Sequence, residues 1–344
     1  MCIRDRTRTS FSRAAAAAAA LIAATAASAQ EYTLCVADSF PTTHLNAINT
    51  QSWIDRVEEL TNGRVEFQYY PAEQLAKSAD LLDAALNGIA DIVYAPPLYI
   101  SDRLPLSTVA ALPLIGNVTG DEKLNQAWHT LAMEELNEAG LLPQGVRIVR
   151  SQVTPPYQIM MRSEKVETLD QLQGKKIRSS GGVQEKSVER LGAIPTAIPA
   201  PDLYPAIQRG TVDGTLFNLP PANGYKLEEQ LMYSTDNLNL GLFPLFYVIN
   251  EEVWQTLPED IQQALVQASL DVMPEVYKLN AEREAKFRNS LEAKGGAVYQ
   301  VPDEQRQARA AELAPVSEEW VADMEARGLP GQRVFDRWQD LLTE

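Results

Sequence analysis

The sequence is poor in the residues that build metal centres and nucleophilic active sites. Its 344 residues include only two cysteines and two histidines. His44 and His129 lie far apart, and no HExxH, GxSxG or paired CxxC motif accompanies them. The GxxxxGK[ST] phosphate loop and the GxGxxG fingerprint are also missing. Nothing in the sequence therefore argues for an enzyme, and we expect no catalytic residues, no metal and no cofactor.

Long hydrophobic runs are missing as well, except near the start. Four arginines precede an alanine-rich run at 14–26, and Ala27-Ser28-Ala29 is a small-x-small site. This pattern is typical of a secretory signal peptide cleaved near Ala29. The run is shorter than the roughly 20 residues that a transmembrane helix needs. We therefore expect residues 1–29 to be removed on export.

Positive charge is scarce. The chain has 30 Lys and Arg against 46 Asp and Glu, a formal net charge of −16, and removal of 1–29 makes it more acidic. Such a protein repels nucleic acid and anionic lipid, so we expect neither as a partner. An anionic ligand would need a local cationic site. Cys35 would be the one cysteine left, too few for a disulfide within the mature chain, and we expect it buried in a strand.

Alternating strand and helix patterns open the mature chain. Apolar or alternating runs at 32–37, 65–70 and 90–95 predict strands, and the spacing at 46–60 and 81–86 predicts helices between them. This order is typical of a parallel α/β sheet.

One pattern of helix, glycine, aspartate and strand occurs twice in the sequence. Residues 82–96 and 204–218 each read as an amphipathic helix, a glycine, two residues, an aspartate and a short apolar strand. Gly88 and Gly210 would end the helices in the left-handed conformation. Asp91 and Asp213 each lie three residues after that glycine, and we expect Asp213 to accept hydrogen bonds from backbone N–H groups. The repetition predicts two α/β domains built alike.

The domain layout follows from two crossing segments. Pro155-Pro156 marks one, and the apolar run at 239–250 marks a second that becomes a core strand. A helix pattern at 259–294 is interrupted near Pro274, and further amphipathic helices fill 303–344. We predict a signal peptide at 1–29, a first domain of 30–152 plus about 243–283, and a second of 153–242 plus about 284–344.

Several stretches together resemble the periplasmic solute-binding proteins of TRAP transporters, the tripartite ATP-independent carriers of the C4-dicarboxylate-binding-protein type. The likeness covers nearly the whole mature chain in the family's order. Its more specific pieces are G-x-K-I-R and A-x-x-x-G-x-V-D-G. The segments that carry it are 57–75, 87–114, 169–182, 191–214, 227–235 and 249–265.

The resemblance implies a function in solute uptake and a location in the periplasm. Family members have two α/β domains that close a cleft on a small organic acid, with linking strands and a long C-terminal helix. The loaded protein then docks on membrane permease subunits. Together with the signal peptide and the missing catalytic motifs, the resemblance leads us to expect a periplasmic protein that is not an enzyme, and a monomer whose C-terminal helices are buried within one subunit. A binding protein of an ABC importer and a soluble enzyme acting on an organic acid are the alternatives.

The resemblance places the ligand carboxylate on Arg178. "GKKIR" reads as a strand whose last residue projects into the cleft, at the carboxyl end where α/β sheets bind ligands. A guanidinium stays charged, and its planar fork matches both carboxylate oxygens. Lys175 and Lys176 are expected to be solvated.

Further candidates come from positions around the family's cleft. Asn218 could bind a carboxylate or hydroxyl, and Phe217 could pack on the carbon skeleton. Some members carry a second arginine about 20 residues before the first, where this chain has Gln158, a departure that puts a doubly clamped ligand in doubt unless Arg162 substitutes. The remaining candidates are Tyr157 beside Gln158 and, from the first domain, Phe40, His44 and Tyr94.

Overall fold

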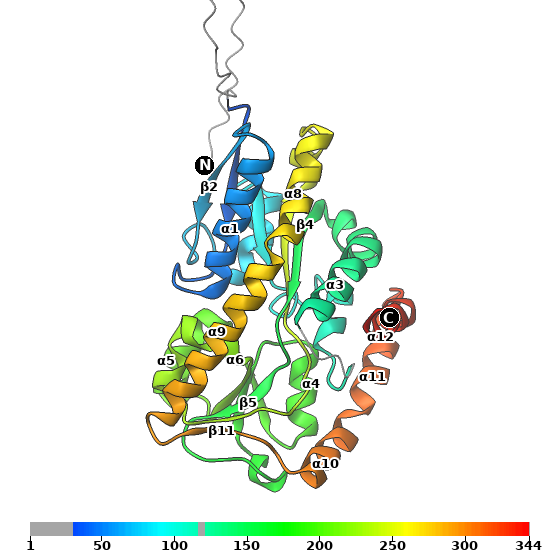
Figure 1. Ribbon diagram of the computed structural model, residues 1–344. Coiled ribbons are helices and arrows are strands. Elements are labelled where there is room, and N and C mark those ends of the chain that lie inside the picture. Colours follow the sequence, from blue (N-terminus) through cyan, green and yellow to red (C-terminus); the bar gives the residue numbers. More distant parts are fainter. Residues whose placement is uncertain (1–29, 116–120, 344) are drawn as a thin grey trace, which may run out of the picture.

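Two β-sheets organise the chain in the computed structural model, which describes residues 30–115 and 121–343 (Figure 1). The predicted signal peptide lies outside the described residues. One sheet has the strand order β2-β1-β3-β10-β4 and the other the order β11-β9-β5-β8-β6-β7. We call the first of these sheets, with the helices packed on it, the first unit, and the second sheet with its helices the second unit. Within 30–115 and 121–343, no helix is long and apolar enough to cross a membrane.

The first sheet confirms the strands expected near the start of the mature chain. Its strand β1 runs parallel to β2 and β3, whereas β10 lies antiparallel between β3 and β4. Cys35 on β1 is 1% exposed, as expected for a buried strand residue. The strands are β1 (Tyr32–Ala37), β2 (Val65–Tyr70), β3 (Ile92–Ala95), β4 (Val146–Val153) and β10 (Pro244–Asn250), with helices α1 (Leu45–Leu60), α2 (Leu81–Leu86), α3 (Asp121–Leu131), α7 (Glu251–Trp254) and α8 (Glu259–Asp271).

The second sheet mixes parallel and antiparallel strands. Its strand β6 runs parallel to β7 and β8, and β5 runs antiparallel to β8 and β9. The strands are β5 (Gln158–Met161), β6 (Lys176–Ser179), β7 (Ile194–Ala197), β8 (Gly214–Phe217), β9 (Tyr233–Thr235) and β11 (Ala297–Tyr299), with helices α4 (Val183–Arg190), α5 (Leu203–Gln208) and α6 (Leu219–Ala222).

The internal repeat is confirmed: the same helix, glycine, aspartate and strand arrangement occurs in both units. Gly88 and Gly210 end α2 and α5 with φ of 68° and 70°, in the left-handed region that favours glycine. Asp91 then accepts a hydrogen bond from the Cys35 backbone N–H at 2.8 Å, and Asp213 accepts one from the Lys176 N–H at 2.9 Å. Each aspartate thus ties the start of its strand to the neighbouring strand.

Up to the end of β11, three connections run between the units in the part of the chain that the structure describes. Residues 154–157 link β4 to β5, and residues 236–243 link β9 back to β10. The third is the helix pair α8 and α9 (Met273–Glu292), which break at Val272, next to the predicted interruption at Pro274. Figure 1 shows α9 passing from α8 beside the first sheet to α6 and β11, and α9 contacts both α1 and α6.

The C-terminal helices divide between the units. In α10 (Asp303–Leu313), buried Arg309 donates to the carbonyls of Val166 and Glu167 in the second unit. Then α11 (Pro315–Ala326) and α12 (Gly331–Thr343) return to the first unit, where Trp320 Nε1 donates to Thr108 Oγ1 at 2.8 Å.

Apolar packing holds α12 on the first unit. The rings of Trp338 and Trp128 on α3 meet edge to face, 5.7 Å apart. These contacts run against placing all of 284–344 in the second domain, because the apolar face of α12 is buried on α3. They favour assigning α12 to the first unit, whereas α11 also contacts α4 of the second unit through the Arg190–Glu319 pair; the domain boundaries stay a prediction.

The packing of α12 predicts a large stability effect at Trp338, which is fully buried. We expect Trp338→Ala to lower the free energy of unfolding by about 3–5 kcal/mol, the range for deleting a buried aromatic side chain. Urea unfolding followed by circular dichroism measures it. Trp254→Ala is the control, since Trp254 is half-buried and should cost less. Equal, small losses in the two variants would show that α12 is not part of the core.

Candidate ligand-binding site

An aromatic cavity lies where the two units meet the crossing segments. Its accessible volume is about 30 Å³, room for little more than a water molecule. The first unit, the second unit and both crossing segments contribute to its wall. Its lining residues are Phe40, His44, Asn46, Tyr94, Tyr99, Thr154, Tyr157, Ala200, Phe217, Asn218, Pro221, Tyr225, Phe243 and Leu245. Six of the nine residues predicted from sequence are in this set: Phe40, His44, Tyr94, Tyr157, Phe217 and Asn218.

Arg178 lies directly behind this lining, with none of its surface exposed to solvent. Its Nε donates to the Ile198 carbonyl at 2.7 Å and its Nη1 to the Leu216 carbonyl at 3.2 Å. The guanidinium carbon stands 5.5 Å from the centre of the Phe217 ring. Burial raises the pKa of Tyr157 to about 12, and the nearby charge of Arg178 acts in the opposite direction. The cation is therefore close to two residues of the cavity wall.

The third nitrogen of that guanidinium, Nη2, is buried and makes no hydrogen bond of good geometry within the described residues, and no salt bridge found there includes Arg178. The Tyr99 hydroxyl lies close to the guanidinium: burial raises the pKa of Tyr99, and the charge of Arg178 acts in the opposite direction. A buried polar group without a partner costs free energy, and a buried charge costs more. Two carbonyls orient the guanidinium group, and its remaining N–H groups can still donate to an acceptor. The arrangement suits an anion that binds from the cavity.

Aromatic rings form the rest of the wall and bridge the two units. Phe40 stacks on His44 at 4.9 Å and contacts Tyr94 at 4.7 Å. His44 meets Tyr225 of the second unit at 4.6 Å, and Tyr225 meets Phe217 edge to face at 6.1 Å. Such rings offer flat apolar faces to a ligand.

Asn218 holds the second unit to a crossing segment. It directly follows β8 and begins α6, and its Nδ2 donates to the Pro155 carbonyl at 3.3 Å. The amide thus stands at the junction of α6 with the β4–β5 connection. It is 2% exposed and lines the cavity.

His44 caps the N-terminus of α1. Its Nδ1 accepts a hydrogen bond from the Asn46 backbone N–H at 3.1 Å. Burial lowers the pKa of His44 to about 3, and the charge of Arg283 lowers it further, so the ring is neutral at neutral pH. A Cβ on Gly224 would lie 2.2 Å from His44 Cδ2, so only glycine lets the turn after α6 approach the ring.

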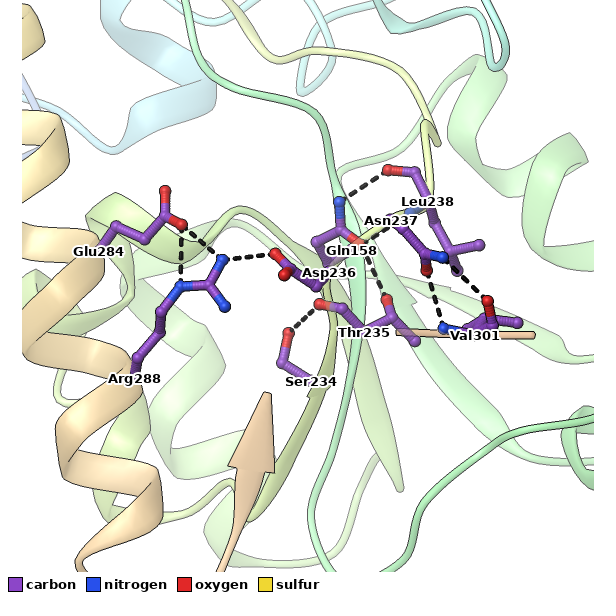
Figure 2. A network of polar contacts seen from close by, with 9 residues as sticks. All are labelled: Gln158, Ser234, Thr235, Asp236, Asn237, Leu238, Glu284, Arg288 and Val301. Atoms are coloured by element: carbon purple, nitrogen blue, oxygen red, sulfur yellow. Dashed lines mark hydrogen bonds and ion pairs between the residues drawn. The ribbon is translucent and has the colours of Figure 1, made fainter. Parts of the chain in front are cut away.

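Gln158 is not in the cavity wall, although sequence placed it there. Figure 2 shows its amide bound to the second crossing segment. Oε1 accepts from Thr235 Oγ1 at 2.9 Å and from the Leu238 N–H at 3.2 Å, and Nε2 donates to the Leu238 carbonyl at 2.7 Å. Successive strand residues face opposite sides, so Tyr157 reaches the cavity and Gln158 does not. We therefore leave Gln158 out of the proposed site.

Arg162 also lies away from the cavity. It is exposed and follows the last residue of β5, with its Nη1 beside Gly210. It cannot replace a second ligand-binding arginine from there, and we leave it out as well. Lys176 is exposed and Lys175 pairs with Glu164 at the surface, in keeping with the solvated positions expected for them.

Sequence reasoning missed more than half of the wall. Tyr99 and Tyr225 occupy turns with no motif of their own, and Asn46 begins a helix that was read only for its apolar face. Thr154 and Phe243 could have been found, because both lie in segments predicted to cross between the units. No sequence signal showed which residues of those segments face inward.

Two α/β units around an aromatic cavity with a buried cation define the class of two-lobed solute-binding proteins. Residues 36–323 match the model of the bacterial extracellular solute-binding protein family 7, DctP, and the chain belongs to this family.

Relatives extend over most of the chain. It is 27% identical over 321 residues to the outer membrane transporter protein TsaT of Comamonas testosteroni, covering 90% of this chain and 92% of TsaT. It is also 27% identical over 270 residues to the C4-dicarboxylate-binding periplasmic protein DctP of Rhodobacter capsulatus, covering 76% and 78% of the two chains.

Solved structures of TRAP solute-binding proteins share the fold. The protein from Rhodoferax ferrireducens, in complex with benzoate, superposes with a TM-score of 0.81 at 25% identity, covering 90% of this chain and 97% of that one. A marine metagenome protein specific for aromatic acid ligands, in complex with 3-hydroxybenzoate, gives 0.82 at 22% identity, with coverage of 92% and 99%. The two-domain α/β fold expected from sequence is confirmed.

The neutral state of His44 predicts how acid affects stability. In the unfolded chain the imidazole binds a proton below its ordinary pKa of about 6.5, whereas in the folded protein it does so only near pH 3. Stability is therefore lost as pH falls from about 6.5, by about 1.4 kcal/mol per pH unit from this residue.

Urea unfolding of wild type and His44→Gln between pH 7.5 and pH 4 tests this dependence. We expect a shallower loss of stability in the variant, and the difference at pH 7.5 measures the cost of the altered cap. Parallel curves over the whole range would mean that His44 takes up its proton in the folded protein.

Proposed function

We propose that this protein is the periplasmic binding subunit of a TRAP transporter, exported by its signal peptide, and that it captures a small carboxylic acid for delivery to the membrane permease. Family membership supports the class of protein. The observation that carries the choice of ligand is the buried Arg178, whose Nη2 is unpaired beside the cavity.

The carboxylate end of the ligand would pair with Arg178. Two carbonyls already fix the guanidinium plane, so little side-chain entropy is lost when it binds an oxygen. Asn218 and the hydroxyl of Tyr157 lie in the same wall and can donate to the second oxygen. Charge-assisted hydrogen bonds in a water-poor cavity are the strong ones.

The body of the ligand would lie between the aromatic rings. Phe40, Tyr94, Tyr225 and Phe243 present flat apolar surface, which suits a planar or compact hydrocarbon skeleton. The accessible volume of about 30 Å³ is far below the range for small-molecule sites, so the side chains of the wall must move apart to admit a ligand. The benzoate bound by the Rhodoferax ferrireducens protein is an acid of this kind, which supports an aromatic or similarly compact monocarboxylate here.

Capture would couple binding to closure of the two units. Residues of both units touch the same cavity, so a ligand that fills it bridges them and favours the closed arrangement. The units already meet closely: a Cβ on Gly181 would lie 2.8 Å from the Leu98 carbonyl oxygen. The closed surface would then be what the permease recognises, with the driving force supplied at the membrane rather than by this chain.

Removing the cation tests the proposed function. We expect Arg178→Ala to weaken binding of benzoate by about 2–5 kcal/mol, the scale for truncating one partner of a buried charge pair. Isothermal titration calorimetry on the mature protein measures it. The matched control is Arg162→Ala, which removes an exposed arginine of the same unit and should leave the affinity unchanged. Equal affinities for both variants would contradict a carboxylate site at Arg178.

The aromatic wall predicts a preference among acids. A ligand at a hundredfold excess over its dissociation constant stabilises a protein by about 2.7 kcal/mol. In a thermal-shift screen we expect benzoate and phenylacetate to raise the melting temperature more than succinate does, because a second carboxylate would be buried against aromatic rings. A larger shift with succinate would point to a dicarboxylate ligand, and product formation from a bound acid would reveal an enzyme.

A further inference from the structure

Two buried polar atoms in the first-unit wall of the cavity lack partners. They are His44 Nε2 and Asn46 Oδ1, which have no hydrogen bond to any described residue. Both residues line the cavity, and they are 1% and 5% exposed. In native proteins such groups are nearly always paired, and an exception inside a binding cavity points to a missing ligand group or water.

The chemistry of the first atom follows from the helix cap. A backbone N–H can only donate, so the bond from the Asn46 N–H makes His44 Nδ1 an acceptor. A neutral imidazole carries one proton, which must then be on Nε2. His44 therefore presents an N–H donor from a ring whose orientation is fixed by the cap and by stacking on Phe40.

The second atom is an acceptor. The backbone of Asn46 is engaged at both ends, since its N–H donates to His44 and its carbonyl accepts from Thr50 Oγ1 at 2.8 Å. The side-chain oxygen Oδ1 can only accept. Within two residues at the start of α1, the wall thus offers one donor and one acceptor, both without a charge.

A hydroxyl, of a ligand or of a bound water, can satisfy both atoms. It can accept from an N–H and donate to a carbonyl oxygen through a single atom. A carboxylate could not donate to Asn46 Oδ1, and an ammonium could not accept from His44 Nε2. An apolar group would leave both atoms unpaired at a cost. The wall therefore discriminates by chemistry as well as by shape.

We propose that the ligand is a hydroxylated aromatic acid whose hydroxyl accepts from His44 Nε2–H and donates to Asn46 Oδ1, while its carboxylate pairs with Arg178. This assignment rests on the proposed function and adds a second recognition point to it. The carboxylate contact comes from the second unit and the hydroxyl contact from the first. A hydroxyl acid therefore bridges the units with a directed polar bond at each end.

Matched pairs of acids test the proposal. Benzoate and phenylacetate are compared with their 3-hydroxy and 4-hydroxy derivatives by isothermal titration calorimetry on the mature protein. We expect at least one hydroxy acid to bind about ten- to a hundredfold tighter than its parent, because the parent leaves a buried donor and acceptor unpaired. The methyl ether of that hydroxy acid, which can accept but not donate, should lose most of the gain.

Variants then assign the effect to these two side chains. The readout is the ratio of dissociation constants for parent and hydroxy acid, so a general loss of affinity cancels. We expect Asn46→Ala and His44→Phe each to bring the ratio to within about threefold of one, and His44→Gln, which keeps an N–H donor, to restore part of it. Asn49→Ala is the matched control, because Asn49 is a buried amide on the same helix outside the cavity wall, and it should keep the wild-type ratio.

The outcomes separate this proposal from the function it rests on. Parents and hydroxy acids that bind equally well, with binding that still depends on Arg178, would overturn the hydroxyl assignment and leave a carboxylate-binding protein. An equal effect of Asn49→Ala and Asn46→Ala on the ratio would also overturn it. Failure of every acid in the panel to bind would overturn both.

Discussion

A guanidinium held out of water is the constraint on which the rest of the site depends. Arg178 has lost its hydration and regains part of it from the Ile198 and Leu216 carbonyls. A lone buried cation is unfavourable, so the structure around it must be stable enough to hold the charge until an anion arrives. The β6 strand, paired with β7 on one side and β8 on the other, provides that support. Under the proposed function, a bound carboxylate would offset the cost of burying this charge.

The aromatic wall and the buried cation require each other. Rings from Phe217 and Tyr157 keep water away from the guanidinium, which strengthens its electrostatic attraction for an anion. In the first-unit part of the wall, His44 and Asn46 are polar but neutral, so the cavity combines a buried cation, aromatic faces and uncharged hydrogen-bonding groups. Under the proposed function, this combination suits a ligand with an acid at one end.

The chain crosses between the units three times before α10 and returns once more at the C-terminus, and this affects how the units move. The β4–β5 connection, the β9–β10 connection and the α8–α9 pair all pass near the cavity, and the first two contribute Thr154, Tyr157 and Phe243 to its wall. The last helices pack α12 on α3 through Trp338 and Trp128. Under the proposed function, a ligand would therefore contact the segments that join the units.

Local signals in the sequence determined the elements, the doubled helix–glycine–aspartate–strand device and the place of Arg178, because hydrophobic period, turn glycines and a short motif depend on neighbouring residues. They also brought Phe40, Tyr94 and Asn218 into consideration. Only the tertiary structure decided that Tyr157 faces the cavity while Gln158 turns to Leu238, and that Tyr99 and Tyr225 complete the wall. It also decided that α12 belongs with α3. These outcomes depend on which distant side chains bury one another, and strand facing and helix docking are set by packing across the whole molecule rather than by adjacent residues.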